Sequence, residues 1–312
     1  MNARRMIILF ALLLSLPVAA TAQRLALSFD DGLDPSTQSQ AAAWNDALLR
    51  ALAAAHLRSI LYPAGTHVDS PAGLALVHAW GEAGHAIGNH TYSHWNLAAP
   101  EVSAAAFIAD AQRQEDLLRA MPGWTARLRF PFLKEGDTGA KRDQVRAWAA
   151  TRGYRSGAVS IDASDWYYNV RYLAWLERHP GDAAHWLRDA YLAHLQSRAR
   201  YYESLSQRLF GRSVGHVLLL HTNAINAAFL PDVIAMFRQA HWTLIDVDAA
   251  YADPLYSIQP AVLPAGESIL WSIAKQKGMV GLRYPAEDDV YEKPLLDAAD
   301  PDLRAGRSSP RR

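Results

Sequence analysis

The sequence predicts an α/β fold, a distorted (β/α) barrel with six or seven parallel strands. Short apolar runs alternate with helical segments along most of the 312 residues, which is typical of parallel strands joined by crossover helices. Six or seven such units in about 250 residues suit a closed or partly closed barrel better than an open sheet. Reactive side chains are expected at the carboxyl ends of the strands of such a barrel, and this chain has them there.

The expected strands are short, apolar and followed by turn residues or polar side chains. They lie at 25–29, 59–62, 85–89, 127–130, 156–161, 217–220 and 243–247.

The expected helices occupy most of the connections. They lie at 40–56, 70–82, 100–121, 141–151 and 231–240. Ser70 before Pro71 has the composition of a helix cap followed by a proline in the first turn. A helical insertion is predicted at about 167–215, before the last strands, where Leu187, Tyr191 and Leu195 recur at helical spacing.

The chain is expected to divide into three parts. Residues 1–22 have a basic start, an apolar run and the small residues Ala20-Thr21-Ala22, which together predict a cleaved signal peptide. Export to the periplasm or the medium follows, with no stable membrane insertion after cleavage. Residues 23–280 would form the catalytic domain, and 281–312 a polar C-terminal tail that is disordered from Arg304.

Composition excludes several classes of function. The chain has no cysteine, so it has no disulfide, thiolate metal ligand or cysteine nucleophile. Its formal net charge of zero argues against a nucleic-acid partner, because phosphate binding requires concentrated positive charge.

Two adjacent carboxylates follow the first strand, in Phe29-Asp-Asp-Gly32. Burying carboxylates is costly unless they are paired, hydrogen-bonded or bound to a metal, so Asp30 and Asp31 require partners. An acidic turn at the surface is the alternative interpretation, and the other strand ends decide between the two.

The next strand ends supply suitable partners. His90 and His94 follow the third strand, four residues apart on one side of a turn, and can hold a single ion with a carboxylate. Arg129 lies at the end of the fourth strand and can keep a buried carboxylate ionised through a forked hydrogen bond. Asp162-Ala-Ser-Asp-Trp166 follows the fifth strand, and His221 ends the sixth.

Taken together, these segments resemble the five motifs of the polysaccharide deacetylases of carbohydrate esterase family four. The matching segments are Ser28–Gly32, His90–His94, Arg129–Phe132, Asp162–Trp166 and Leu219–His221, in that order. The resemblance covers roughly residues 24–250 and implies a deacetylase-type barrel.

The resemblance also implies roles for individual residues. Asp31, His90 and His94 would bind a metal, usually zinc, although histidine and carboxylate ligands also accept Co²⁺ or Ni²⁺. Asp30 would be the general base, and Arg129 would orient it. His221 would be the general acid, and Asp165 would tune it. Trp166 and Leu219 would form the walls of the acetyl pocket. Phe132 stands where the family usually has tyrosine. If the tyrosine hydroxyl contacts sugar, this change weakens substrate binding. If the position acts only through its backbone N–H, which helps to hold the oxyanion, the change has no effect.

The function expected from this resemblance is metal-dependent removal of N-acetyl groups from an N-acetylglucosamine-containing polysaccharide, with release of acetate. Three alternatives remain open from the sequence. They are an O-acetyl esterase of the xylan type, a cyclic-amide hydrolase on the same scaffold, and a glycan-binding module without catalysis.

Overall fold

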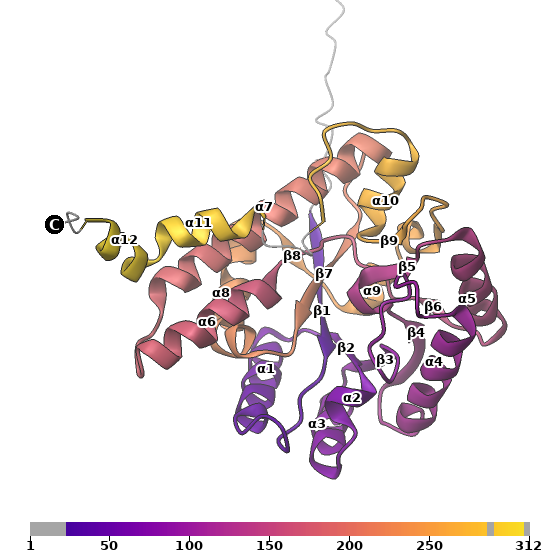
Figure 1. Ribbon diagram of the computed structural model, residues 1–312, viewed down its shortest axis with the longest axis horizontal. Helices are drawn as coiled ribbons and strands as arrows, with labels where there is room; N and C mark the ends of the chain where they lie inside the picture. The colour runs from indigo at the N-terminus through magenta and orange to yellow at the C-terminus, as the bar shows by residue number, and fades with distance from the viewer. Residues whose placement is uncertain (1–22, 286–289, 309–312) are drawn as a thin grey trace, which may run out of the picture.

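A curled sheet of seven parallel strands forms the centre of the computed structural model, which describes residues 23–285 and 290–308 (Figure 1). Six strands follow the order β6-β4-β3-β2-β1-β7, and β8 pairs with β1. The bounds of the strands in this sheet are β1 (Arg24–Asp31), β2 (Ile60–Pro63), β3 (Ala86–Asn89), β4 (Trp124–Leu128), β6 (Arg155–Ser156), β7 (Gly215–His221) and β8 (Thr243–Leu244). The sequence-based prediction of a distorted (β/α) barrel with six or seven parallel strands is confirmed.

Strand β1 lies between β2 and β7 in this sheet and also pairs with β8. Its residues Leu25, Leu27 and Phe29 are almost completely buried, as expected of a parallel strand covered on both faces. In register, Asp30 lies beside Tyr62 of β2 and His221 of β7. Pairing within the sheet thus brings one predicted catalytic carboxylate next to the predicted catalytic histidine.

The strand predicted at 156–161 is divided in the structure. Only Arg155 and Ser156 pair with β4, while Ile161 forms an isolated bridge to Leu218 of β7. The backbone N–H of Leu219 donates to the carbonyl of Ile161. The chain therefore crosses from one edge of the sheet to the other, which carries the following acidic segment toward the end of β7.

Helices fill the connections and cover the sheet. Their bounds are α1 (Ala41–Ala55), α2 (Gly65–Val68), α3 (Pro71–Glu82), α4 (Ala104–Leu118), η1 (Pro131–Leu133), α5 (Gly139–Thr151), α6 (Asp165–Arg178), α7 (His185–Phe210), α8 (Ala224–Gln239), α9 (Val247–Tyr251), η2 (Pro254–Ser257) and α10 (Ile269–Gln276). A small antiparallel pair, β5 (Lys134–Gly136) with β9 (Ala265–Gly266), lies outside the main sheet.

Helix caps explain where some of these helices begin. Ser70 caps α3 as predicted, since its hydroxyl accepts from the N–H of Gly73. The prediction that a helix starts at Pro231 is wrong. Asn223 caps α8 by accepting from Asn226, so this helix starts seven residues earlier and contains Pro231.

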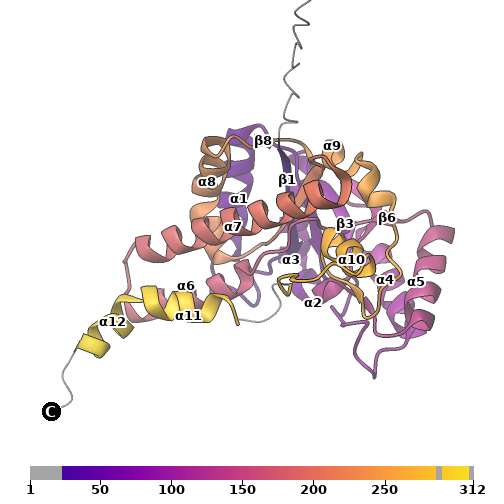
Figure 2. The same cartoon turned by 90° about the horizontal axis from the view of Figure 1, so that it is seen from above.

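Two helices, α6 and α7, form the predicted insertion. The stripe of Leu187, Tyr191 and Leu195 on α7 is fully buried in the main core, which is ordinary packing. In Figure 2, α7 runs across the molecule with α10 at one end and α11 (Glu292–Ala299) along its side, and both helices contact it.

The C-terminal region is more ordered than its composition indicated. Helix α12 (Pro301–Ser308) follows α11, so the predicted disorder from Arg304 is wrong for the residues up to 308. Arg171 of α6 forms ion pairs with Asp297 and Asp300, which attach this region to the insertion. The predicted signal peptide at 1–22 and residues 309–312 lie outside the described ranges.

Within the described ranges, none of the helices combines the length and hydrophobicity needed to cross a bilayer.

Candidate active site

A cavity of about 570 Å³ lies at the carboxyl ends of the strands, where the sequence predicts the functional residues. Eight of the ten predicted site residues line it, namely Asp30, Asp31, His90, His94, Phe132, Trp166, Leu219 and His221. The other two, Arg129 and Asp165, are completely buried directly behind it. The structure therefore brings the whole predicted set together.

Asp30 is held by Arg129 at the bottom of this cavity. Its Oδ1 accepts from Nη1 of Arg129 at 2.7 Å, and both side chains are almost completely buried. The same guanidinium donates to the hydroxyls of Ser28 and Tyr251 and to the carbonyl of Gly157. With four partners, Arg129 has a fixed geometry, and it fixes the orientation of Asp30 in turn.

Burial raises the pKa of Asp30 to about 7, because removing a carboxylate from water disfavours its charged form. The charges of Arg129 and His221 oppose this effect but do not cancel it. A carboxylate with a pKa near neutrality is suited to accept a proton during a reaction and release it afterwards.

Asp31 faces two imidazoles. Its Oδ1 lies 3.3 Å from Nε2 of His94 and 3.8 Å from Nε2 of His90. Nδ1 of His90 lies 2.9 Å from the carbonyl of Arg129, which can only accept, so this nitrogen carries the proton and Nε2 presents a lone pair. Three electron-pair donors thus converge within 4.8 Å of one another.

These donors fit a divalent metal ion. Oδ1 of Asp31 is buried and has no hydrogen-bond partner among the described residues, which is costly unless a cation balances it. Burial lowers the pKa of His90 and that of His94, favouring the neutral form that a metal requires. For Asp31, burial acts in the opposite direction, but His221, His94 and His90 outweigh it and lower the pKa of this carboxyl. The carbonyl that orients His90 is a typical outer partner of a metal-bound histidine.

His221 is paired with Asp165 on the opposite side of the cavity. Its Nδ1 lies 2.7 Å from Oδ1 of Asp165, while its backbone N–H donates to Oδ2. Asn223 and Asn226 donate to the same carboxylate, so the completely buried Asp165 accepts hydrogen bonds on both of its oxygens. Burial acts to lower the pKa of His221, but Asp165 and, more weakly, Asp31 and Asp30 raise it to about 10. The ring is therefore protonated at neutral pH.

The predicted substrate contacts form the outer wall. Leu219 is buried, Trp166 is partly exposed, and Phe132 is half-exposed with its ring 4.7 Å from that of His94. Phe132 and Leu133 both have positive φ angles of 56° and 57°. Such strained backbone is often found at functional sites, and here it accompanies the contact of the Phe132 ring with His94.

The structure adds residues that the sequence analysis missed. His67 lies on α2, directly after β2, with its Nδ1 3.9 Å from Oδ1 of Asp31. Because it follows a strand end, the rule that located His90 and Arg129 could have found it as well. Asn226, in the first turn of the helix that follows β7, could have been found in the same way. Tyr251 could not, since it reaches Arg129 from a helix far along the chain.

A family comparison agrees with this site. Residues 18–156 match the model of the polysaccharide deacetylase family. This range includes Asp30, Asp31, His90, His94 and Arg129, and it ends before Asp165 and His221. No curated protein matches the chain.

Solved structures share the fold at low sequence identity. A mutant of BA3943, described as a family four pseudoenzyme with restored enzymatic activity, matches with a TM-score of 0.52 and 16% identity over 74% of this chain and 68% of its own. Wild-type BA3943 from Bacillus anthracis, described as a pseudoenzyme, has a TM-score of 0.52 and 14% identity over 74% and 66%. A mutant of the peptidoglycan deacetylase PdaC from Bacillus subtilis has a TM-score of 0.50 and 16% identity over 74% and 91%. At these identities the likeness shows the fold and does not show activity.

The buried pair of Arg129 and Asp30 predicts a large effect on stability. Arg129→Gln should lower the free energy of unfolding by about 3–5 kcal/mol, because it leaves a buried carboxylate without its counter-ion. Urea denaturation in the presence of a chelator measures this without a contribution from bound metal. Arg50→Gln, which removes an exposed arginine paired with Asp46, is the matched control and should be indistinguishable from the wild type. Adding Asp30→Asn to Arg129→Gln should restore part of the loss, and a double variant as unstable as the sum of the single ones would contradict this account.

Proposed function

From the match of residues 18–156 to the polysaccharide deacetylase family, we propose that this chain is a metal-dependent hydrolase that removes N-acetyl groups from a glycan. The observation that carries the proposal is the convergence of three functions in one cavity. The donors Asp31, His90 and His94 lie beside a carboxylate with a pKa near 7 and opposite a protonated histidine.

The side chains of the cavity account for each proton in the reaction. Water adds to the acetyl carbon while Asp30 takes one of its protons, and the C–N bond then breaks as Nε2 of His221 gives a proton to the departing nitrogen. The products are acetate and a free amine on the sugar. A divalent ion such as zinc, held by Asp31, His90 and His94, would lower the pKa of water and polarise the acetyl carbonyl.

Protonation of His221 favours an amide substrate over an ester. An amine is a poor leaving group unless it is protonated as the bond breaks, whereas an alkoxide needs less help. The four hydrogen bonds received by Asp165 hold its carboxyl group beside Nδ1 of His221, and this contact raises the pKa of the ring, so a proton remains available on it. This arrangement would be of little use to an esterase.

The surroundings of the reacting atoms support an acetyl group on a sugar. Trp166 and Leu219 offer an apolar wall for the acetyl methyl, and the cavity of about 570 Å³ is large enough for more than one sugar ring. Phe132 retains the backbone N–H that would stabilise the oxyanion, but it cannot give a hydroxyl to sugar. We include export in the proposal on the basis of the N-terminal segment, which would place the enzyme where polysaccharides of the cell envelope occur.

The direct test is acetate release from N-acetylglucosamine oligomers, measured before and after treatment with a chelator. We expect release that the chelator abolishes and that added zinc, cobalt or nickel restores. Acetylated xylan, tested in parallel, separates amide from ester cleavage. No acetate release from the amides, or release that the chelator leaves unchanged, would overturn the proposal.

The two adjacent carboxylates should respond differently to the same substitution. Asp31→Asn should lose the metal and the activity together, because it removes a charged ligand. Asp30→Asn should keep a stoichiometric metal and lower kcat by about 10²–10⁴, which is the usual contribution of a general base. Metal content measured in the same samples decides the assignment, which is wrong if both variants lose metal equally.

The pairing of His221 with Asp165 predicts a change in pH dependence. In Asp165→Asn the histidine loses the charge that raises its pKa, so this pKa falls from about 10 toward its ordinary value. The alkaline limb of the kcat/KM profile should then move to lower pH, with a larger loss of activity at pH 9 than at pH 7. An alkaline limb that stays in place would show that another group is responsible for it.

A further inference from the structure

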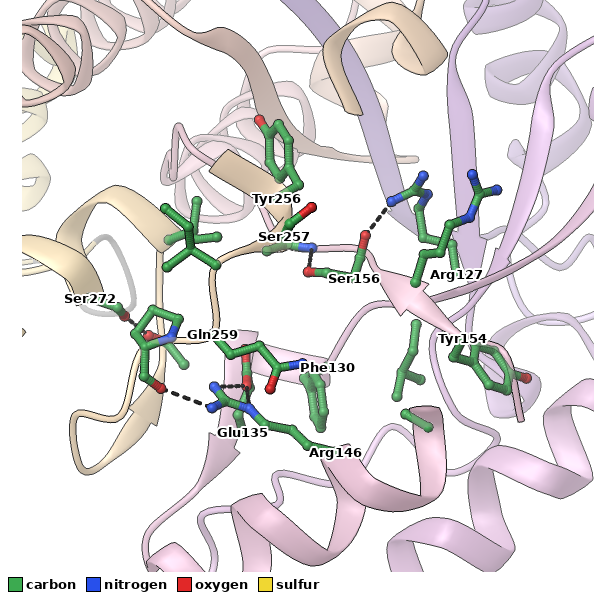
Figure 3. Close-up of a pocket in the computed structure, with 18 of the residues that line it drawn as sticks. Arg127, Phe130, Glu135, Arg146, Tyr154, Ser156, Tyr256, Ser257, Gln259 and Ser272 are labelled. Carbon is green, nitrogen blue, oxygen red and sulfur yellow. Dashed lines mark hydrogen bonds and ion pairs between the residues drawn. The ribbon is translucent and has the colours of Figure 1, made fainter. Parts of the chain in front are cut away.

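A second cavity, of about 320 Å³, is shown in Figure 3. Strands β4 and β6 and helix α5 form one side of it, and the segment from α9 to α10 forms the other. It shares no lining residue with the catalytic cavity. Whatever it binds therefore does not take part directly in the reaction proposed above.

Arg127 of β4 lines this cavity with its charge unbalanced. Its side chain is 5% exposed, its Nη1 donates to the carbonyl of Ser156, and its guanidinium lies 3.8 Å from the centre of the Tyr251 ring. Among the residues that the structure describes, no carboxylate forms an ion pair with it. Burying a guanidinium without a counter-ion is unfavourable, so this position favours an anion.

Other charges around the cavity do not provide that anion. Glu135 is already paired with Arg146 at 2.6 Å, and Glu267 is paired with Lys134. Arg155, on β6 and next to Arg127 in register, donates to the hydroxyl of Thr125 and has no acidic partner in the described ranges. Two arginines on neighbouring strands thus add positive charge to the cavity beyond what its carboxylates neutralise.

The remaining walls suit the body of a small organic molecule. Apolar surface comes from Phe130, Ile258 and Pro260, and Gln259 adds an amide that makes no hydrogen bond within the described part of the chain. The volume is at the lower end of the range for small-molecule sites. These dimensions fit a single sugar ring or a molecule of similar size.

We propose that this cavity binds a small organic oxyanion, with its carboxylate or phosphate on Arg127 and its body against the apolar wall. Arginine suits this role because its planar, forked donors match both groups. Arg155 adds a second positive charge at the same end. The proposal concerns a binding site separate from the reaction, and it can fail or hold regardless of whether the protein is a deacetylase.

Isothermal titration with three probes built on the same sugar ring tests the proposal on the full-length protein. Glucuronate presents a carboxylate, glucose 6-phosphate presents a phosphate, and glucose presents no charge. We expect at least one of the anionic sugars to bind and glucose not to bind, and the ratio of the two anionic affinities identifies the preferred group. Equal binding of glucose, or no binding of either anion, would overturn the proposal.

Variants assign the binding to this cavity. Arg127→Gln should weaken the binding of the anion at least tenfold, Arg155→Gln should weaken it less, and the exposed control Arg50→Gln should leave it unchanged. Gln259→Trp is a second variant for the case in which Arg127→Gln does not fold. Residue 259 is exposed, so the larger side chain should fill the cavity and abolish binding while Arg127 is retained. Binding that survives Gln259→Trp at full strength places the probe elsewhere and overturns the proposal.

Discussion

The buried ion pair between Arg129 and Asp30 is the interaction on which the rest of the site depends. Arg129 follows β4 and reaches Ser28 and Asp30 on β1, Gly157 after β6, and Tyr251 at the end of α9. Three other segments therefore have to be in place before the guanidinium is satisfied. Because an incompletely paired buried charge is costly, this requirement favours one arrangement of the strand ends.

The backbone of Arg129 has a second role in the same site. Its carbonyl lies 2.9 Å from Nδ1 of His90 and selects the tautomer that presents Nε2 to Asp31. One residue thus orients the proposed base through its side chain and a proposed metal ligand through its main chain. This shared support explains how two adjacent carboxylates acquire different environments, with Asp30 held by a cation of the protein and Asp31 facing electron-pair donors that call for a metal.

Comparison with known structures separates fold from activity in this protein. The structures of similar fold include a family four pseudoenzyme, so the barrel by itself does not establish catalysis. What supports catalysis is the donor set itself, in which Asp31, His90 and His94 converge beside Asp30 and opposite His221. The proposed activity therefore depends on these side chains and on the proton positions that their hydrogen bonds impose.

The sequence by itself determined the fold class and the principal side chains of the site. In a parallel α/β barrel the carboxyl ends of all strands meet at one face, so polar residues that follow apolar runs are predicted to be neighbours. The structure places four such residues together, namely Asp30, His90, Arg129 and His221. It did not determine that the strand at 156–161 divides, that α8 continues through Pro231, or that the C-terminal segment forms helices packed on the insertion. Those outcomes depend on contacts between segments far apart in the chain, such as Ile161 with Leu218 and Arg171 with Asp297. Only the tertiary structure showed the hydrogen bond from Arg129 to Tyr251 and the absence of an acidic partner for Arg127 among the described residues. The pairing and burial of a charge depend on residues that folding brings together, and the local sequence does not specify them.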